Sequence, residues 1–268
     1  MHTTLFQLGP FAIRSYGLML ALSFLCGILL ARRRVTRMGI DAQRIMDLAV
    51  VVIVSSIVGS RALYVLFHLE EFSANPLDII NPFQSSGEVG IQGLTMYGGV
   101  LLSIIASLWF LRRHGLPIWK IADAIAPSIA LGVFLTRIGC FLNGCCFGKP
   151  GDYPWCVVFP PESAAGYFFP HQHIHPTQLY ASLYGLLIFG LLLFLERFKK
   201  FDGFTFWLFL LLYAVARFSI DFVRFYEGSM TLSVLGMVLS VNHVISAALF
   251  VLALGMMILL NHKRPSAA

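Results

Sequence analysis

The sequence predicts an all-α integral membrane protein with seven transmembrane helices. Of its 268 residues, 58% are hydrophobic and only 12% are charged, whereas about a quarter of the residues of a soluble domain are charged. Its apolar runs reach the ~20 residues that a helix needs to cross a bilayer. The short alternating segments of a membrane barrel are not apparent. Because this composition cannot cover a water-soluble surface, we expect the chain to lie in lipid.

Seven segments are expected to span the membrane, since each is long enough for ~30 Å of hydrocarbon. The N-terminal stretch lacks the basic start of a cleavable signal peptide, so the first span is predicted to be retained. We expect one polytopic membrane domain over residues 1–268, with a disordered tail at about 264–268. The predicted spans are about 15–31, 45–67, 94–112, 118–140, 176–196, 204–223 and 236–261.

Lysine and arginine residues gather at alternate ends of these spans. Basic groups follow the first, third, fifth and seventh spans, whereas the loops at about 69–93 and 141–175 are acidic and contain one lysine, Lys149. Positively charged loops stay in the cytoplasm, so we expect the N-terminus outside, the C-terminus in the cytoplasm and both long loops outside. Because these charges flank apolar segments, the net charge of +6 does not indicate nucleic-acid binding.

Charged residues inside a span are costly and usually face a cavity or a partner. In the sixth predicted span, Arg217 and Asp221 are four residues apart and can pair on one helix face, which Tyr213 shares. Arg224 follows three residues after Asp221. A purely structural ion pair is one interpretation. The excess of arginine over acid favours the other, a site for an anionic headgroup.

Two further arginines, Arg61 and Arg137, lie towards the outer ends of the second and fourth predicted spans. Either one alone could extend its side chain to the membrane interface. Together with Arg217 and Arg224, however, they run against the rule that places positive charge inside. A guanidinium group matches a phosphate through two parallel hydrogen bonds, so these arginines predict a phospholipid ligand.

Two other stretches contain candidate site residues. In "MYGGV", Gly98 and Gly99 would allow close approach of the backbone and expose N–H groups to an anion, and Tyr97 is a phenol that could donate a hydrogen bond or act as an acid or base. "HQHIHPTQLY" has three alternating histidines that could share a face as metal ligands, although no acidic residue is near. His175 and Gln178 could instead face a cavity.

Six motifs, in chain order, resemble those of the bacterial prolipoprotein diacylglyceryl transferases. The fourth is similar to the family signature Arg-(Ile/Leu)-Gly-Asn-Phe-(Ile/Leu)-Asn-Gly-Glu-x-x-Gly, but Cys140 and Cys145 replace its asparagine and glutamate. Tyr97 stands at the family's histidine in the third motif, and Asp221 at its glutamate in the sixth. The motifs are "RSYGLMLALSF", "GSRALYVLF", "GLTMYGG", "RIGCFLNGCCFG", "HPTQLY" and "YAVARFSIDFVR".

The resemblance implies transfer of the diacylglyceryl group from phosphatidylglycerol to the lipobox cysteine thiol in the signal peptide of a prolipoprotein, with release of glycerol phosphate. It implies a multi-pass protein of the bacterial cytoplasmic (inner) membrane, with the active site facing the outer half and no metal or organic cofactor. The implied catalytic residues are Arg137, Arg217, Tyr97 and Asp221. The implied substrate-binding residues are Tyr16, Arg61, Gly98, Gly99, Asn143, Gly148, Gln178, Tyr213 and Arg224.

Two alternatives remain open from the sequence. The same scaffold could be a phospholipid-dependent transferase with another acceptor, or a non-enzymatic sensor built on thiols or a metal. The second alternative would be built on Cys140, Cys145, Cys146 and Cys156 together with His171, His173 and His175. The stretch "TRIGCFLNGCCFGKP" holds three of the five cysteines. Outside the cytoplasm a disulfide is also feasible, joining Cys145 or Cys146 to Cys156. Buried free thiols and a metal or catalytic role are the other interpretations.

Overall fold

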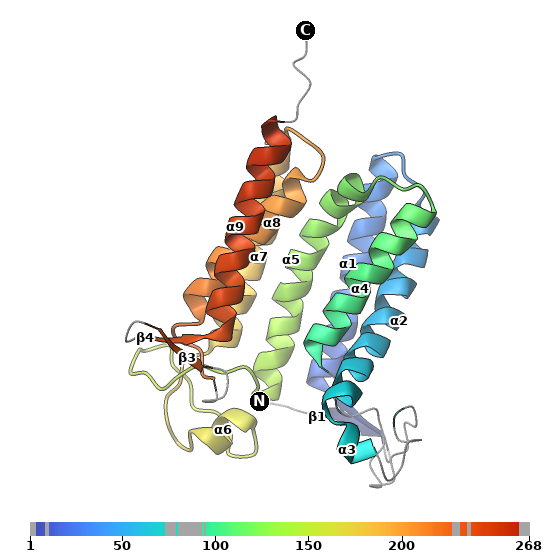
Figure 1. Cartoon of the computed structure of the whole chain (residues 1–268). Coiled ribbons are helices and arrows are strands. Elements are labelled where there is room, and N and C mark those ends of the chain that lie inside the picture. Colours follow the sequence, from blue (N-terminus) through green and yellow to red (C-terminus); the bar gives the residue numbers. More distant parts are fainter. Residues whose placement is uncertain are drawn as a thin grey trace. The chain divides into compact units, whose positions relative to one another are not determined.

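The computed structural model describes residues 4–8, 11–72, 79, 93, 95–226, 231–234 and 237–262 (Figure 1). The chain forms two compact units, of which the first comprises Met1–Arg34 and Trp119–Ala268 and the second Val35–Ile118. Each unit is described by itself. The predicted tail at 264–268 and most of the predicted loop at 69–93 lie outside the described residues.

Helices dominate the first unit, and short hairpins connect or precede them. The two hairpins are antiparallel pairs, with Leu8 opposite Phe11 in one and Val234 opposite Met237 in the other. Its helices are α1 (Ser15–Arg37, which runs on into the second unit), α5 (Ile118–Asn143), α6 (Ala164–Phe168), α7 (Thr177–Leu195), the 3₁₀ turn η2 (Glu196–Phe198), α8 (Phe204–Ile220) and α9 (Val241–His262). Its strands are β1 (Thr4–Leu8), β2 (Phe11–Arg14), β3 (Thr231–Val234) and β4 (Met237–Ser240).

A core of buried side chains joins α5, α7 and α8. Gly185 of α7 lets this helix approach α5 closely, because a Cβ added at Gly185 would lie 2.8 Å from the Phe134 backbone nitrogen of α5. Close backbone approach through small residues is typical of helix packing in membranes. The buried core residues are Ala126, Ala130, Ile188, Leu192, Leu208 and Phe209.

The fully buried carboxylate of Asp123 ties α5 to the beginning of α8. Its Oδ2 accepts a hydrogen bond from the Gly203 N–H at 2.7 Å, and its Oδ1 accepts one from the Phe206 N–H at 3.0 Å. The same carboxylate pairs with the Lys199 Nζ at 2.9 Å. Burial opposes the charge on Lys199, but Asp123 and Asp202 outweigh it and raise its pKa. This network holds the connection between α7 and α8 in place.

The second unit is a pair of packed helices, α2 (Ala42–Phe67) and α4 (Met96–Arg113), with the short helix α3 (Leu69–Phe72) after α2. The Asp41 carboxylate caps α2 by accepting the Gln43 N–H at 2.9 Å. Thr95 attaches the start of α4 to α2 through its backbone N–H, which donates to the Ser60 carbonyl at 3.1 Å. The helices cross at Gly59 and Gly98, where the backbones are so close that neither position has room for a Cβ.

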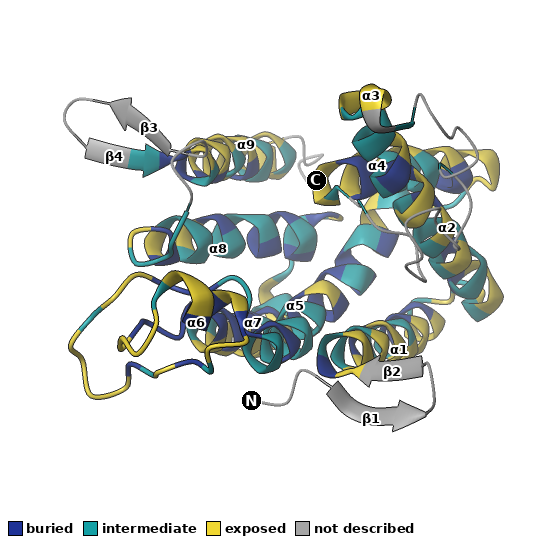
Figure 2. Ribbon diagram, turned by 90° about the horizontal axis from the view of Figure 1, so that it is seen from below, coloured by how far each residue is buried: buried dark blue, intermediate teal, exposed yellow. Residues whose placement is uncertain are grey.

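Five helices are long and apolar enough to cross a membrane within the described part of the chain: Ser15–Arg37, Ala42–Phe67, Ile118–Asn143, Thr177–Phe198 and Val241–His262. Figure 2 shows exposed residues along α1, α2 and α9, and large apolar side chains such as Leu25, Val54 and Val251 are among them. Faces of this kind fit lipid rather than water. The predicted helical membrane protein is confirmed.

Two details of the predicted spans differ from the structure. The last helix begins at Val241 rather than at about 236, because residues 237–240 pair with β3 as strand β4. The first helix continues past 31 to Arg37, since arginine is a good helix former. The predicted spans at 94–112 and 204–223 are helical as α4 and α8, and the count of seven spans stays a prediction.

Candidate functional site

Two arginines of the first unit share the same pair of tyrosines. Arg137, near the end of α5, interacts electrostatically with Tyr184 of α7 and Tyr213 of α8. Arg217 of α8 interacts with both of these tyrosines as well. The two tyrosine rings meet edge to face, with their centroids 6.0 Å apart. The structure therefore brings together Arg137, Arg217 and Tyr213, as the sequence predicted.

Arg217 is held by a buried carboxylate and a phenol. Its Nη1 pairs with the Asp221 Oδ1 at 2.8 Å, which confirms the predicted pair one helical turn apart. Its Nη2 donates to the Tyr226 hydroxyl at 2.6 Å, and that hydroxyl donates to the same carboxylate oxygen at 2.7 Å. Burial raises the pKa of Tyr226 to about 12, and its hydrogen bond to Asp221 acts in the same direction. The triangle fixes the orientation of the Arg217 guanidinium.

The cluster has more positive than negative charge. Neither Arg137 nor Arg224 forms an ion pair with a carboxylate of the described residues. Arg224 lies over the Tyr226 ring, with its guanidinium carbon 5.4 Å from the ring centroid, and close enough to Cys146 to act on its charge. Partly buried guanidinium groups without a carboxylate are suited to bind an external anion.

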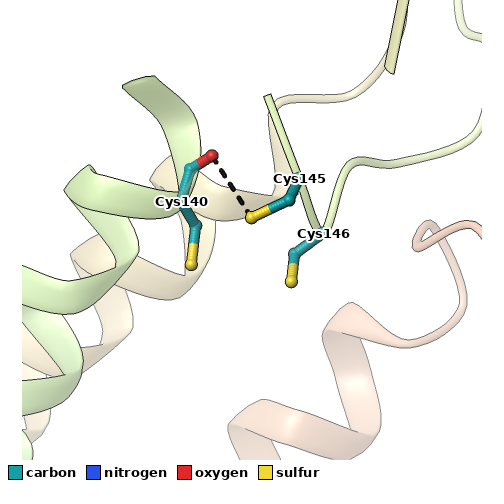
Figure 3. A group of neighbouring side chains, drawn as sticks. All are labelled: Cys140, Cys145 and Cys146. Carbon is teal, nitrogen blue, oxygen red and sulfur yellow. Dashed lines mark hydrogen bonds between the residues drawn. The ribbon is translucent and has the colours of Figure 1, made fainter. Parts of the chain in front are cut away.

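Three cysteines, Cys140, Cys145 and Cys146, lie next to one another at the end of α5 and in the loop that follows it (Figure 3). The Arg137 Nη1 lies 3.9 Å from the Cys140 sulfur, and the Cys145 thiol donates to the Cys140 carbonyl at 3.8 Å. The sulfur atoms of Cys140, Cys145 and Cys146 all lie within 4.8 Å of one another. Hydrogen bonds with Cys140 and Cys145, and then the charges of Arg224 and Arg137, lower the pKa of Cys146.

All five cysteines are free thiols, so the predicted alternative of a disulfide to Cys156 is wrong. Cys156 belongs to another part of the loop, where its sulfur lies 3.8 Å from the His175 Nδ1. The interpretation of Cys140 and Cys156 as buried thiols is confirmed, because the loop packs around its own small aromatic core. That core consists of Phe147, Phe159, Ala165 and Ile174.

The beginning of α7 holds the cysteine loop by its backbone. The Gln178 Nε2 donates to the Cys145 carbonyl at 2.8 Å, and the Thr177 hydroxyl donates to the Cys146 carbonyl at 2.9 Å. The Gln178 side chain is buried, with a residue exposure of 1%. Gln178 and Thr177 therefore fix the backbone of the loop that carries Cys145 and Cys146. The structure does not show it facing an open cavity.

Gly148 has a structural reason for lacking a side chain. An added Cβ would lie 2.6 Å from both the carbonyl oxygen and the Cβ of His175. The Gly148 N–H donates to that same carbonyl at 3.1 Å. The close backbone approach that requires a glycine at this position is therefore to His175.

The remaining predicted residues of the first unit lie close to the cysteines. Tyr16 is within electrostatic range of Arg137 and of all three thiols. It also packs near Gly139, where an added Cβ would lie 3.4 Å from the Tyr16 Cα. Asn143 ends α5 and interacts with the Cys145 thiol. Both residues therefore lie at the predicted site.

The other predicted residues belong to the second unit. Arg61 is buried, and its Nε donates to the Ile79 carbonyl at 2.9 Å while its Nη1 donates to the Gly93 carbonyl at 3.4 Å. Arg61 thereby holds the backbone of two described residues that follow α2. Tyr97 is 55% exposed. The adjacent glycines, Gly98 and Gly99, are buried against α2, a role that accounts for both without a ligand.

Two of the three histidines of the loop have separate partners. The His175 Nδ1 lies 3.1 Å from the Tyr180 hydroxyl, and the His173 Nδ1 lies 3.4 Å from the Cys156 carbonyl. Among the described residues, only the three cysteines bring ligand atoms close enough to share one metal ion. The alternative of a metal site made by the three histidines is therefore wrong.

Sequence reasoning missed three residues of the cluster. Tyr226 lies in the turn after α8, where helical spacing no longer predicts which side chains meet. Tyr184 could have been found as a buried hydroxyl in an apolar helix. His243 of α9 is sandwiched by the rings of Phe218 and Phe222, at centroid distances of 5.0 and 4.7 Å, and interacts electrostatically with Asp221. No local pattern indicates it.

Apolar helices of spanning length and a cluster of arginines with unbalanced positive charge define a helical membrane protein with a partly buried cationic cluster. Comparison with known proteins is more specific. The family model described as prolipoprotein diacylglyceryl transferase matches residues 3–259. The chain belongs to this family.

Its relatives include three proteins named phosphatidylglycerol–prolipoprotein diacylglyceryl transferase. That of Prochlorococcus marinus (strain NATL1A) is 33% identical over 233 residues, which cover 82% of this chain and 77% of the relative. That of Clostridium tetani is 32% identical over 225 residues, covering 84% and 86%. That of Solidesulfovibrio magneticus is 37% identical over 223 residues, covering 81% and 79%.

Proposed function

We propose that this chain is a transferase that moves the diacylglyceryl group of phosphatidylglycerol to the lipobox cysteine thiol of a prolipoprotein. The family match and the names of the three relatives support the reaction. The observation that carries the assignment of the site is Arg137, a partly buried guanidinium with no ion-pair partner among the described carboxylates. Membrane lipids supply one substrate and the signal peptide of a prolipoprotein supplies the other.

The reaction places new negative charge on the phosphate. The thiol loses its proton, its sulfur forms a bond to the terminal glyceryl carbon, and the bond between that carbon and the phosphate oxygen breaks. The electron pair stays on the oxygen, so glycerol phosphate leaves with one more negative charge than the phosphodiester carried, until it takes up a proton. Arg137 and Arg224 supply positive charge that this transition state needs. Arg217, fixed by Asp221 and Tyr226, supplies a third guanidinium.

The other predicted residues have supporting or substrate-lining roles in this proposal. Tyr16 and Tyr213 line the headgroup site, and Asn143, Gln178 and Gly148 hold the loop beside it. Tyr97, Arg61, Gly98 and Gly99 are assigned to the site by their sequence motifs alone.

We further propose seven spans in a single polytopic domain of the bacterial inner membrane, with the active site towards the outer half. The match over residues 3–259 as one stretch supports a single domain. The helices α4 and α8, both apolar, supply the two additional spans. In the first unit the basic residues Arg34 and Lys199 pair with Glu196 and Asp123, far along the helices from Arg137. This separation supports a cytoplasmic end opposite to the site.

Arginine variants test the proposal. The assay measures transfer of a labelled diacylglyceryl group from phosphatidylglycerol vesicles to a lipobox peptide. Arg137→Ala and Arg217→Ala should each lower the rate at least ~100-fold, as when one transition-state donor is removed. Arg137→Lys should retain part of it, because the charge stays but the two-pronged contact is lost. Arg197→Ala is the matched control, since this arginine stacks on Phe194 with a guanidinium-to-centroid distance of 3.8 Å.

Two outcomes would contradict the proposal in different ways. Transfer at the wild-type rate by Arg137→Ala or Arg217→Ala would remove that residue from the site. Consumption of phosphatidylglycerol without lipidation of the peptide would indicate a different acceptor. Expression in a bacterium depleted of its own transferase provides the same test in cells, because only the stated activity restores lipoprotein maturation.

A further inference from the structure

We infer that Cys140, Cys145 and Cys146 form a zinc site with one open coordination position, and that the lipobox thiol binds there as the fourth ligand. The inference rests on the proposed function for the identity of the fourth ligand. The site itself rests on the structure, in which these three sulfur atoms converge between the end of α5 and the following loop (Figure 3). The resemblance to the family implies no metal, so this site is a property of this chain.

The distances suit a small, thiophilic ion. Zinc binds thiolate sulfur at about 2.3 Å in a tetrahedral arrangement, so neighbouring sulfur atoms lie about 3.8 Å apart. The three sulfurs already lie within 4.8 Å of one another. Small rotations of the side chains would therefore complete the site. Three protein ligands and one open position are the arrangement of catalytic zinc, whereas structural zinc sites have four protein ligands.

The backbone supports convergence of two adjacent cysteines. Neighbouring residues of an extended chain point to opposite sides, which would separate Cys145 from Cys146. Cys146 instead has a φ of 62°, in the left-handed region that residues other than glycine rarely adopt. The carbonyl groups of Cys145 and Cys146 are fixed by Gln178 and Thr177 at 2.8 and 2.9 Å. The loop is thus held in the conformation that brings both sulfur atoms within 4.8 Å of the Cys140 sulfur.

The surrounding charges favour an anionic zinc complex. Three thiolates and one Zn²⁺ have a net charge of −1, and a fourth thiolate makes it −2. Arg137 lies 3.9 Å from the Cys140 sulfur, and Arg224 acts on Cys146. Positive groups and hydrogen-bond donors around the ligands tune a metal site of this kind. The same two arginines would also meet the phosphate, so nucleophile and leaving group lie beside one cationic cluster.

The zinc site would supply the deprotonated thiol that the reaction requires as its nucleophile. A free cysteine thiol has a pKa of about 8.5 and is mostly protonated at neutral pH, yet the nucleophile is the thiolate. The nearby carboxylate of Asp221 is already engaged by Arg217 and Tyr226, and tyrosine, with an ordinary pKa near 10, is a poor base. A thiol that coordinates zinc is deprotonated outright.

The proposed step balances without a redox change. The lipobox thiol releases its proton to water as its sulfur binds Zn²⁺. The coordinated sulfur then uses an electron pair to form the carbon–sulfur bond, and the carbon–oxygen bond breaks towards the phosphate. The thioether product is neutral at sulfur and a weaker ligand, so it leaves the metal. Zinc stays divalent throughout.

Metal binding is measured first, independently of transfer. The full-length chain in nanodiscs that contain phosphatidylglycerol, kept reduced and stripped of metal, is titrated with Zn²⁺ and with Co²⁺ as its spectroscopic substitute. We expect one ion per chain and a sulfur-to-cobalt charge-transfer band. Serine at all three positions should abolish both, whereas Cys26→Ser should change neither. In the wild-type chain, Zn²⁺ should protect Cys140, Cys145 and Cys146 from alkylation but leave the reactivity of Cys26 unchanged, a result that needs no variant to fold.

The role of the fourth ligand is measured next. A lipobox peptide should change the cobalt band, and the same peptide with serine in place of cysteine should not. Removal of zinc should lower the transfer rate at least ~100-fold, which is the size of the rate loss expected when a positioned proton acceptor or a catalytic metal is removed. Added zinc should restore the rate.

The outcomes separate this inference from the proposed function. Less than one ion per chain, or binding that survives loss of the three cysteines, overturns the zinc site. Transfer by the metal-free chain at the zinc-loaded rate overturns its catalytic role and leaves the proposed function intact. Stoichiometric zinc that binds the peptide thiol, with no transfer in any form of the protein, supports the site and overturns the proposed function.

Discussion

Replacing Gly98 by alanine tests whether this glycine serves helix packing. A Cβ at this position would lie 2.2 Å from the Gly59 carbonyl oxygen and 2.5 Å from the Leu63 Cβ. Favourable contacts between heavy atoms lie at about 3.5–4.0 Å, so α2 and α4 would have to separate by about 1 Å or more. The carbonyl is part of a helix backbone and cannot rotate away. The methyl group therefore disturbs the contact between the two helices.

The magnitude follows from two opposing contributions. Overpacking typically costs about 1–3 kcal/mol, and alanine is favoured over glycine inside a helix by about 1 kcal/mol. Because the clash is with backbone, we expect the upper part of the range and a net destabilisation of about 1–2 kcal/mol. Gly255 of α9 has no atom within 4 Å of an added Cβ. Gly255→Ala is therefore the matched control and should be neutral or stabilising.

Both variants are compared by unfolding in mixed micelles with increasing denaturing detergent, followed by circular dichroism. Equal stability of Gly98→Ala and Gly255→Ala would refute the packing argument. Loss of diacylglyceryl transfer by Gly98→Ala at unchanged stability would favour the other interpretation of "MYGGV", in which the glycine backbone contacts the lipid headgroup.

Two further predictions concern the first unit. Asp123→Ala should destabilise the protein by about 3 kcal/mol, the lower end of the range for breaking a buried ion pair, because Lys199 keeps Asp202 as a partner at 3.1 Å; unfolding at the wild-type detergent concentration would contradict this. Tyr226→Phe removes the hydroxyl between Arg217 and Asp221 and should lower transfer roughly tenfold, as for a lost hydrogen bond of about 1–1.5 kcal/mol. The exposed Tyr167 provides the control Tyr167→Phe, and equal rates for the two variants would show that the triangle does not position Arg217.

The sequence could predict what depends on local spacing. Runs of apolar residues as long as a bilayer is thick identified the helices, because a lipid-exposed backbone must satisfy its hydrogen bonds within each helix. The spacing of four between Arg217 and Asp221 predicted their ion pair, since residues one turn apart share a face. Both rules use geometry within a single helix, which is the part of the structure that is encoded most directly.

Contacts between distant segments could not be predicted in this way. Tyr226 reaches Arg217 only because the chain turns after Ile220, and His243 reaches the same region from α9. Glycine is ambiguous for a similar reason. Its missing side chain indicates a close approach, but the sequence does not name the partner. At Gly98 and Gly148 the partners are Gly59 and His175, and both contacts are made by protein backbone.

The cysteines show how the position of a motif in the folded structure changes its interpretation. From the spacing alone, a disulfide, a buried thiol and a metal ligand were all compatible with "GCFLNGCC". The structure separates Cys156, which lies beside His175, from three thiols that converge beside Arg137. Two of these three, Cys140 and Cys145, are the positions where the chain departs from the family signature. Departures that occur together in space, next to the arginines proposed to bind phosphate, are more consistent with altered chemistry at one site than with independent loss of two side chains.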